Sequence, residues 1–461
     1  MPTPLPRPFP VSGFARAAAR VAVSWPQTGM LFQRTLLRLG LAGVLTAGSL
    51  LAAGGFPATS RLLAEEWPAF RGPRGDGTST ESRAPLTWSS TKNIRWKAPL
   101  PGPGNGSPIV WGNRVFVTGP TADPVERALF CFDRRDGRLL WQKGVTYTAE
   151  DPTHRTNPQA SSTPVTDGQR VIAWYGSAGV SCYDLEGKEL WHRDLGVFRH
   201  IWGYGSSPVI HDGRVLLNCG PGERSFLIAL DIETGKTLWQ VDEPGGASGD
   251  QGADEWIGSW STPRIVRVAG SELVLVSQPH HVNAHDPATG KIAWTQEGLG
   301  KLVYTSPLIE GEIAVAMGGY HGPAIGLRLG SADAATKPQS LWRHDQKNPQ
   351  RIGSGVIVDG KVYMANEQFL AQCLDLQTGR ELWQARLPQG TIWASIVKIA
   401  DRLYVTNQAG TTLVWKVNPE KLELLAENAV DETCNASLAV SNGELFLRTH
   451  GHLYCIAEPA P

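Results

Sequence analysis

Three absences narrow what this chain can be. It has no net charge, because 43 lysine and arginine residues balance 43 aspartate and glutamate residues. A neutral chain offers no field that would attract nucleic acid or an anionic membrane surface. None of its six cysteines is adjacent to another, and no Cys-x-x-Cys-His motif for covalent haem occurs. We therefore expect neither nucleic-acid binding nor a haem domain within these residues.

The residues that are abundant indicate many short strands. The 51 glycines and 33 prolines punctuate turns, and the 17 tryptophans suit half-buried sheet surfaces. At 461 residues the chain is longer than one compact core usually holds, so a modular architecture is expected.

The N-terminal region is typical of a targeting segment. Residues 1–29 are rich in Pro, Ala and Arg, and Met30 is followed by Arg34, Arg38 and an uncharged run over Leu39–Ser60. A basic stretch before an apolar one is the pattern of a secretory signal, and Met30 is the expected start. A retained membrane anchor is the alternative, because the run is long enough to span a bilayer.

Two details favour cleavage and export. Small residues end the run near Ala64, and its Gly and Ala content is high for an anchor. No cysteine occurs before Cys131, which argues against a lipoprotein. We predict a periplasmic or cell-surface monomer that has no membrane span once the signal is removed.

A repeat organises the rest of the chain. The segment Asp231–Trp239, which contains Thr-Gly before its final Trp, recurs at 286–294 and 375–383. Repeat tryptophans stand between 41 residues (342 to 383) and 55 residues (239 to 294) apart, the length of a four-stranded propeller blade. The tryptophans expected to dock one blade on the next are Trp96, Trp141, Trp191, Trp239, Trp294, Trp342 and Trp383.

The start of each unit predicts a hairpin. Ser-Pro or Thr-Pro precedes a short apolar strand in five units, and turns such as Asp212-Gly213 then lead into a second apolar strand. First strands are expected near residues 108, 164, 208, 263, 307, 355, 396 and 438. Such small sheets cannot bury both faces alone, so neighbours must stack around an axis.

The two ends of the repeat region are incomplete and together make one unit. The seventh unit ends in a strand at 422–425 without Trp, and the eighth stops at 453–456. The strand Ile94–Lys97 precedes the first unit and has no blade of its own. We therefore predict an all-β, eight-bladed propeller of four-stranded antiparallel blades, closed by Ile94–Lys97 in the last blade, because closure removes exposed edges.

The predicted organisation has three parts. Residues 1–64 form the N-terminal extension and signal, 65–93 a polar leader segment, and 94–458 the propeller. The leader is turn-rich, and we expect it to lie along the propeller surface.

The unit Ala-x-Asp-x-x-Thr-Gly-x-x-x-Trp at 229–239 and 284–294 resembles the tryptophan-docking repeat of the pyrroloquinoline-quinone (PQQ)-like propeller superfamily. The resemblance covers roughly residues 94–457. That superfamily includes PQQ-dependent alcohol dehydrogenases and a cofactor-free propeller of the outer-membrane β-barrel assembly machinery, and the chain looks like the non-catalytic branch. The resemblance implies the fold, but a fold does not fix a function.

The cysteines are expected to be structural. Cys131, Cys182, Cys373 and Cys455 share a repeat column with Ala229, which indicates a small buried side chain. One such position per blade places most thiols beyond disulfide reach. The dehydrogenases that the chain resembles carry a disulfide between adjacent cysteines beside the cofactor, and its absence counts against that activity.

The loops that enter the first strands and join the second to the third strands should meet at one end of the axis. Aromatic faces and a few cations there suit a planar or sugar-like ligand, although the aromatics could instead plug the ring. The candidate ligand-binding residues are His154, Arg155, Asn157, His200, Trp202, Tyr204, Glu255, Trp256, Trp260, Tyr304, Arg351, Glu367, Trp393 and Asn407.

A metal centre is not expected. The PQQ enzymes implied by the resemblance hold calcium with Glu, Asn and Asp, and Glu367, Asn366 and Asn407 could contribute oxygens. No axial Asp aligns with them. The pairs His280-His281 and Tyr320-His321 would face opposite sides of a strand. We expect no cofactor and no catalytic residue, with PQQ and calcium as the open alternative.

Three functions remain in view. The first is a binding or scaffold module that takes a protein or polymer partner through its loop face. The second is a PQQ- and calcium-dependent oxidoreductase for an alcohol or sugar, with a divergent site. The third is a carbohydrate-binding propeller, because Trp202, Trp256, Trp260 and Trp393 are predicted at the mouth.

Overall fold

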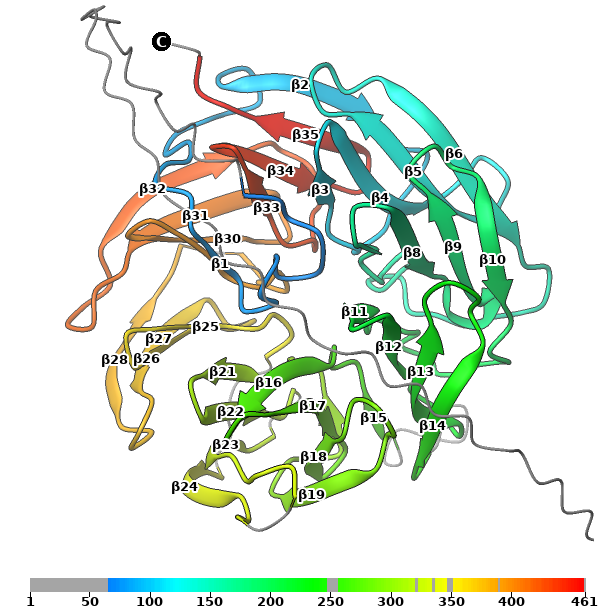
Figure 1. Ribbon diagram of the computed structural model, residues 1–461. Coiled ribbons are helices and arrows are strands. Elements are labelled where there is room, and N and C mark those ends of the chain that lie inside the picture. The colour runs from blue at the N-terminus through cyan, green and yellow to red at the C-terminus, as the bar shows by residue number, and fades with distance from the viewer. Residues whose placement is uncertain are drawn as a thin grey trace, which may run out of the picture. The chain divides into compact units, whose positions relative to one another are not determined.

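The computed structural model describes residues 65–246, 256–319, 322–333, 336–345, 351–388 and 390–459. In these residues eight four-stranded sheets stand around one axis, which confirms the predicted eight-bladed propeller (Figure 1). The one helix in this part of the chain is a 3-10 turn at Gly176–Ala178. None of the described helices is long and apolar enough to cross a bilayer. The expected signal segment, 1–64, lies outside the described residues.

Each blade runs from an inner strand at the axis to an outer strand at the rim, and blades are numbered by their inner strands. The inner strands are β3 (Ile109–Trp111), β7 (Val165–Thr166), β11 (Val209–His211), β16 (Arg264–Val268), β21 (Leu308–Glu310), β25 (Val356–Val358), β29 (Val397–Ile399) and β33 (Ala439–Ser441). The second strands are β4 (Arg114–Pro120), β8 (Arg170–Trp174), β12 (Arg214–Cys219), β17 (Ser271–Gln278), β22 (Ile313–Met317), β26 (Lys361–Ala365), β30 (Arg402–Thr406) and β34 (Glu444–Arg448).

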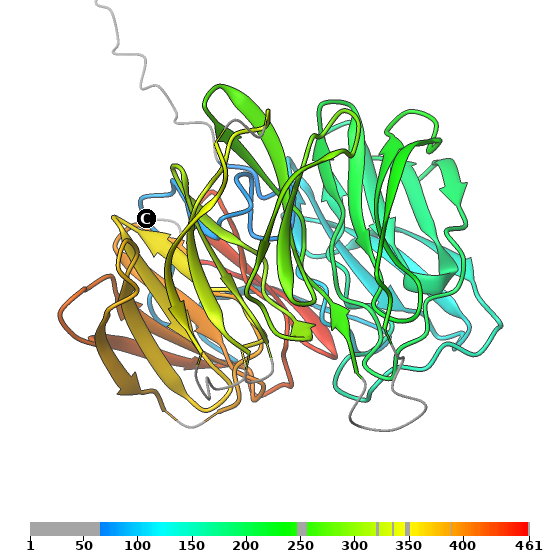
Figure 2. The ribbon, with the colours of Figure 1, turned by 90° about the horizontal axis from the view of Figure 1, so that it is seen from below.

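The third and outer strands complete the blades, which lie side by side when the ring is seen from its edge (Figure 2). The third strands are β5 (Glu126–Asp133), β9 (Val180–Asp184), β13 (Ser225–Asp231), β18 (His281–His285), β23 (Ala324–Arg328), β27 (Leu370–Asp375), β31 (Thr411–Lys416) and β35 (His452–Ile456). The outer strands are β6 (Leu139–Thr146), β10 (Glu189–Arg193), β14 (Thr237–Glu243), β19 (Ile292–Glu297), β24 (Gln339–His344), β28 (Glu381–Arg386), β32 (Leu424–Ala429) and β2 (Ile94–Pro99). The seventh outer strand begins two residues later and ends four residues later than predicted.

The N-terminal strand closes the ring as predicted. Strand β2 pairs antiparallel with β35, with Trp96 opposite Cys455 and Lys97 opposite Tyr454. Because β2 is the outer strand of blade 8, the last blade is built from both ends of the repeat region. Strand β35 is therefore paired on both sides, and blade 8 has its full set of four strands.

Each docking tryptophan reaches the next blade by the same contact. The indole Nε1 of Trp96 donates to the carbonyl of Arg134 at 2.7 Å, and the other six donate in the same way at 2.8 to 3.1 Å. Five of these rings also lie against a glycine turn of the next blade. A Cβ on Gly235 would stand 2.6 Å from Trp191, so the turn needs glycine for space as well as for its φ of +66°.

The small repeat column has a physical cause. Cys131, Cys182, Cys373 and Cys455 each stand directly opposite a docking tryptophan on the neighbouring strand. Only a small side chain leaves room for the indole. Blade 5 has Gly326 there, and a Cβ would lie 2.2 Å from Trp342. All six cysteines are buried and free, as expected.

The junction of blades 7 and 8 is made differently. Its docking position is Ala426, which pairs with Val414 where the other blades have tryptophan. The buried Trp88 of the leader belongs to the same apolar cluster, and its backbone N–H donates to Asn428 Oδ1 at 2.8 Å. The leader therefore supplies the large aromatic ring that the outer strand of blade 7 lacks.

The leader does not lie along the surface, so that expectation is wrong for its first half. The Pro68 carbonyl accepts from the Thr166 N–H of blade 2 at 2.9 Å, and Arg71 Nη1 donates to the Ser354 carbonyl of blade 6 at 3.1 Å. Blades 2 and 6 face each other across the ring, so the chain between these residues crosses the axis (Figure 1). Strand β1 (Thr78–Ser79) then adds a parallel fifth strand beside β29. The cause is apolar burial, because Trp67 is 1% exposed.

Candidate functional site

A cavity of about 430 Å³ occupies the axis at the end where the entry loops converge. We call it the axial cup. Its described wall is made by residues of all eight entry loops, by one second-to-third loop residue and by the leader. The cup is open, so the aromatics at the mouth do not plug the ring.

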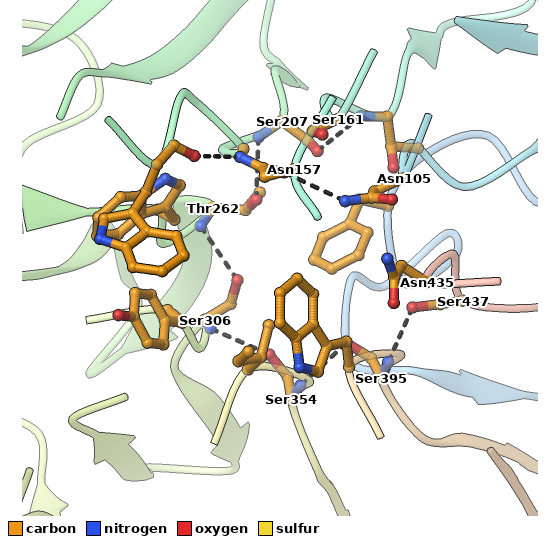
Figure 3. A pocket seen from close by; sticks show the side chains of 18 of the residues that line it. Asn105, Asn157, Ser161, Ser207, Thr262, Ser306, Ser354, Ser395, Asn435 and Ser437 are labelled. Atoms are coloured by element: carbon orange, nitrogen blue, oxygen red, sulfur yellow. Dashed lines mark hydrogen bonds between the residues drawn. The ribbon is translucent and has the colours of Figure 1, made fainter. Parts of the chain in front are cut away.

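The waist of the cup is a closed ring of eight hydroxyls, one from each blade. Figure 3 shows part of this ring, from Ser207 to Ser437. The backbone N–H of each member donates to the hydroxyl oxygen of the next member at 2.9 to 3.1 Å, and the eighth returns to the first. We call it the hydroxyl ring; its members are Ser107, Thr163, Ser207, Thr262, Ser306, Ser354, Ser395 and Ser437. Each residue stands two positions before the first residue of an inner strand, which explains why the positions repeat.

One side of the cup is an aromatic arc. The rings of His154 and Trp202 lie 4.4 Å apart, and Trp256 meets Trp202 edge-on at 5.5 Å. Trp260 and Tyr304 form a second edge-on pair at 5.0 Å. These pairs present flat apolar faces from the entry loops of blades 2 to 5.

A short parallel ladder fixes part of this arc. Strands β15 (Gly258–Ser259) and β20 (Leu302–Val303) pair with each other, and the Trp260 N–H donates to the Val303 carbonyl at 2.8 Å. The indole of Trp260 also donates to the Gly203 carbonyl at 2.8 Å. Three consecutive entry loops are thereby tied together.

The other side of the cup is polar (Figure 3). Asn157 Nδ2 donates to the carbonyls of Trp202 at 2.6 Å and Tyr204 at 2.9 Å, which holds the Trp202 loop in place. Asn105 Nδ2 donates to Asn157 Oδ1 at 3.2 Å, and Asn435 lines the cup beside it. The buried Asn105 Oδ1 accepts no hydrogen bond. This amide arc combines fixed donors with an unused acceptor.

Glu367 supplies the carboxylate among the described lining residues. Its Oε1 accepts from the indole of Trp393 at 3.2 Å. The pair stands on blades 6 and 7, apart from the aromatic arc.

The structure places eight of the fourteen candidate residues in the cup: His154, Asn157, Trp202, Trp256, Trp260, Tyr304, Glu367 and Trp393. The others do not line it. Arg155 is exposed, His200 packs edge-on behind Trp260 at 5.1 Å, and Tyr204 packs on Trp174. Arg351 and Asn407 are buried outside the lining, and Glu255 lies outside the described residues.

The described residues do not fit a PQQ–calcium centre. The Asn366 and Asn407 side-chain oxygens each accept two backbone N–H groups of their own turns. Neither asparagine lines the cup, which leaves Glu367 alone among the three proposed ligands. Calcium takes six to eight oxygen ligands, and no group of three His, Cys, Asp or Glu side chains that could hold a metal occurs in the described part.

Sequence reasoning missed the hydroxyl ring and eight other lining residues, among them Phe70, Asn105 and Asn435. The signal for the ring was present, because Ser or Thr stands before every first strand. That pattern counts the blades but does not by itself show that the hydroxyls meet at the axis. Phe70 could not be found in this way, because the course of the leader is a tertiary feature.

Eight blades, seven of them docked by a tryptophan, around an axial cup define a propeller of the quinoprotein alcohol dehydrogenase-like class. The chain belongs to the PQQ-like family whose profile is described as outer membrane protein assembly factor BamB, which matches residues 78–199, 126–250 and 225–458.

Curated relatives in this class are dehydrogenases. Polyvinylalcohol dehydrogenase of Pseudomonas sp is 25% identical over 238 residues, which is 44% of this chain and 36% of that protein. Quinohemoprotein alcohol dehydrogenase ADH-IIG of Pseudomonas putida is 28% identical over 46% of this chain and 31% of that protein. The matched part thus spans about a third of each relative.

Solved structures share the fold. BamB from Moraxella catarrhalis matches with a TM-score of 0.55 and 15% identity over 77% of this chain and 95% of that one. Quinohemoprotein alcohol dehydrogenase from Comamonas testosteroni matches with a TM-score of 0.61 and 12% identity over 86% of this chain and 81% of that one.

Proposed function

We propose that the chain is an exported binding module whose axial cup takes a ligand with flat apolar faces and hydroxyl groups, such as a sugar or a polyol chain. The observation that carries the proposal is the division of the cup into an aromatic arc and an amide arc above a hydroxyl ring. Aromatic faces pack on the apolar faces of a sugar ring, while amides and hydroxyls recognise its polar edge.

The size of the cup suits this class of ligand. Its volume of about 430 Å³ lies within the range of roughly 300–1,000 Å³ that small-molecule sites occupy. The named relatives are an alcohol dehydrogenase and polyvinylalcohol dehydrogenases, whose names describe hydroxylated substrates. The outer-membrane assembly description of the family supports a periplasmic or cell-surface module that engages a partner.

Binding is tested by titrating the purified chain with a panel of neutral and acidic oligosaccharides and polyols, followed by calorimetry. Trp202→Ala and Trp393→Ala should each weaken a detected interaction by about 10- to 100-fold, as stacking rings contribute roughly 1–3 kcal/mol. Trp111→Ala removes a half-buried indole outside the cup and should leave the affinity unchanged. Equal affinity in all four proteins would remove the cup as the site.

A second candidate function is a quinoprotein oxidoreductase, which the similarity to alcohol dehydrogenases favours. The described oxygen donors argue against this function, because only Glu367 of the three proposed calcium ligands lines the cup. Reconstitution with PQQ and Ca²⁺ separates the two. A quinone absorbance shift together with dye-coupled oxidation of an alcohol or sugar would support the enzyme, and silence in both would remove it.

A further inference from the structure

The O–H groups of the hydroxyl ring are unused as hydrogen-bond donors among the described residues. Each hydroxyl oxygen accepts one backbone N–H, yet no hydroxyl of the eight donates to any acceptor among the described residues. All eight line the cup. Their protons are therefore available to whatever occupies the waist, and they are spread around its full circumference.

The floor beneath the ring is closed by the leader. Phe70 lines the cup and stands between Pro68, bonded to blade 2, and Arg71, bonded to blade 6. A ligand that enters from the loop face therefore cannot pass through the propeller, and its leading end stops at the hydroxyl ring. The group at that leading end meets the hydroxyls.

Two guanidinium groups lie directly below the ring. Arg71 donates to the carbonyls of Ser354 and Gly355, and Arg264 donates to the carbonyls of Arg74 and Gly75. Both are buried, and neither forms an ion pair with a carboxylate within the described residues. Asp76 is the carboxylate that acts on both through space. One carboxylate thus stands near two cations.

A third guanidinium stands at the level of the ring. Arg448 is fully buried, and its Nη1 donates to the carbonyls of Gly106 at 3.3 Å and Ala160 at 3.4 Å, beside ring residue Ser107. Its Nη2 has no hydrogen-bond partner. Burial lowers the pKa of Arg448 to about 9, and the sulfur of Cys434 partly opposes this shift. Among the described residues, backbone carbonyl groups accept hydrogen bonds from this cation, but no carboxylate forms an ion pair with it.

A buried cation without a counter-charge is unfavourable, and a nearby anion offsets that cost. Charge-assisted hydrogen bonds from hydroxyls to an oxyanion are also stronger than those to a neutral group. Donors around a circumference suit a group with several oxygens better than a monatomic ion. We propose that the hydroxyl ring at the waist of the cup binds an oxyanion, so that the natural ligand carries an anionic oxygen group, a carboxylate or a sulfate, at the end that enters first.

This inference rests on the proposed use of the cup for binding, but its test does not need the natural ligand. The full chain is titrated with sodium sulfate and with sodium acetate at constant ionic strength, and binding is followed by calorimetry. Arg448→Met should weaken the affinity for the probe anion about tenfold or more, because it removes a buried positive charge beside ring residue Ser107. Arg448→Lys keeps the charge and should recover part of that loss.

Arg155→Met is the matched control, because it removes the same charge from an exposed position of a cup loop. It should bind both anions like the wild type. Absence of saturable binding would overturn the proposal, because the ring would then hold water alone. Equal affinity in the wild type and Arg448→Met would also overturn it, because the anion would then bind away from Arg448. Oligosaccharide or polyol binding that Trp202→Ala weakens, without saturable sulfate or acetate binding, would overturn this inference alone, so failure here and failure of the proposed function are distinguishable.

Discussion

The backbone N–H of Ser437 donates to the hydroxyl of Ser107 at 3.0 Å, across 330 residues of sequence. This bond joins blades 8 and 1 at the inner edge of the ring. Pairing of β2 with β35 completes blade 8 at the rim, where Trp96 docks on blade 1. The ring is thus closed at both edges, and the cup stands on a continuous circle of hydrogen bonds.

The docking contact predicts a large difference between two glycines of blade 3. Gly213 and Gly235 have φ of +71° and +66°, but a Cβ meets nothing within 4 Å at Gly213 and lies 2.6 Å from Trp191 at Gly235. Gly213→Ala should cost about 1–2 kcal/mol of unfolding free energy from φ alone. Gly235→Ala should cost about 1–3 kcal/mol more, because the indole must shift. Urea denaturation measures both, and equal costs would contradict the docking account.

The leader predicts coupling between Trp88 and Ala426. Trp88→Ala should destabilise the chain by about 3–5 kcal/mol, because it removes a buried ring from the junction of blades 7 and 8. Lys92→Ala, an exposed change in the same segment, should have little effect. Ala426→Trp should lower the stability of the chain when made alone, but it should cost little stability when it is combined with Trp88→Ala. A double-mutant cycle by thermal denaturation checks this, and additive effects would count against shared space.

The contacts of Glu432 predict that the attachment of the closing strand β2 weakens in acid. Its carboxylate accepts from Lys97 at 2.7 Å, Tyr454 at 2.7 Å and Thr449 at 2.6 Å, and His452 lies 2.9 Å away. Burial raises its pKa, but these hydrogen bonds outweigh burial and lower the pKa to about 2 from an ordinary 4.5.

Because the folded pKa of Glu432 is depressed, its contribution is complete above pH 4.5 and is lost as pH falls towards 2. Glu432→Gln should lower stability at pH 7 by about 1–3 kcal/mol and flatten the profile in that window. Thermal midpoints from pH 7 to pH 2 measure the effect. Parallel profiles for the two proteins would contradict it.

Asn157 is predicted to position the aromatic arc. Its amide donates to the carbonyls of Trp202 and Tyr204, and Asn157→Asp replaces those donors with acceptors. Amide exchange in residues 199–205 should accelerate by about 10- to 100-fold, the loss of roughly 1–3 kcal/mol of local stability. Exchange in β13 of the same blade serves as the internal reference. Unchanged exchange in the loop would show that Asn157 does not hold it.

The fold could be predicted because its cause is repeated in the sequence. Each docking Trp faces a small residue on the neighbouring strand, and five of the seven also lie against a glycine of the next blade, so these residue types recur along the sequence. The strand at Ile94, which has no blade of its own in the sequence, indicates closure. Blade 7 shows the limit of this reasoning, because its Trp is replaced by Ala426 and the missing ring comes from Trp88 outside the repeat.

The site was only partly predictable. The mouth aromatics, such as Trp202 and Trp260, could be assigned to the cup because entry loops must converge. Asn407 and Arg351 also stand on convergent loops, but their side chains turn into local or buried contacts, which spacing does not determine. The floor of the cup depends on how residues 68–71 cross the axis. That course is set by the burial of Trp67, which no local sequence pattern indicates.

The central claim is that the axial cup is a ligand site, and native mass spectrometry tests it most directly. The chain is incubated with a bacterial small-molecule extract, separated from free ligand and weighed intact beside Trp202→Ala, Trp393→Ala and the control Trp111→Ala. The account predicts a mass increment on the wild type and the control that both cup variants lose. An increment retained equally by all four proteins, or none on any of them, would contradict it.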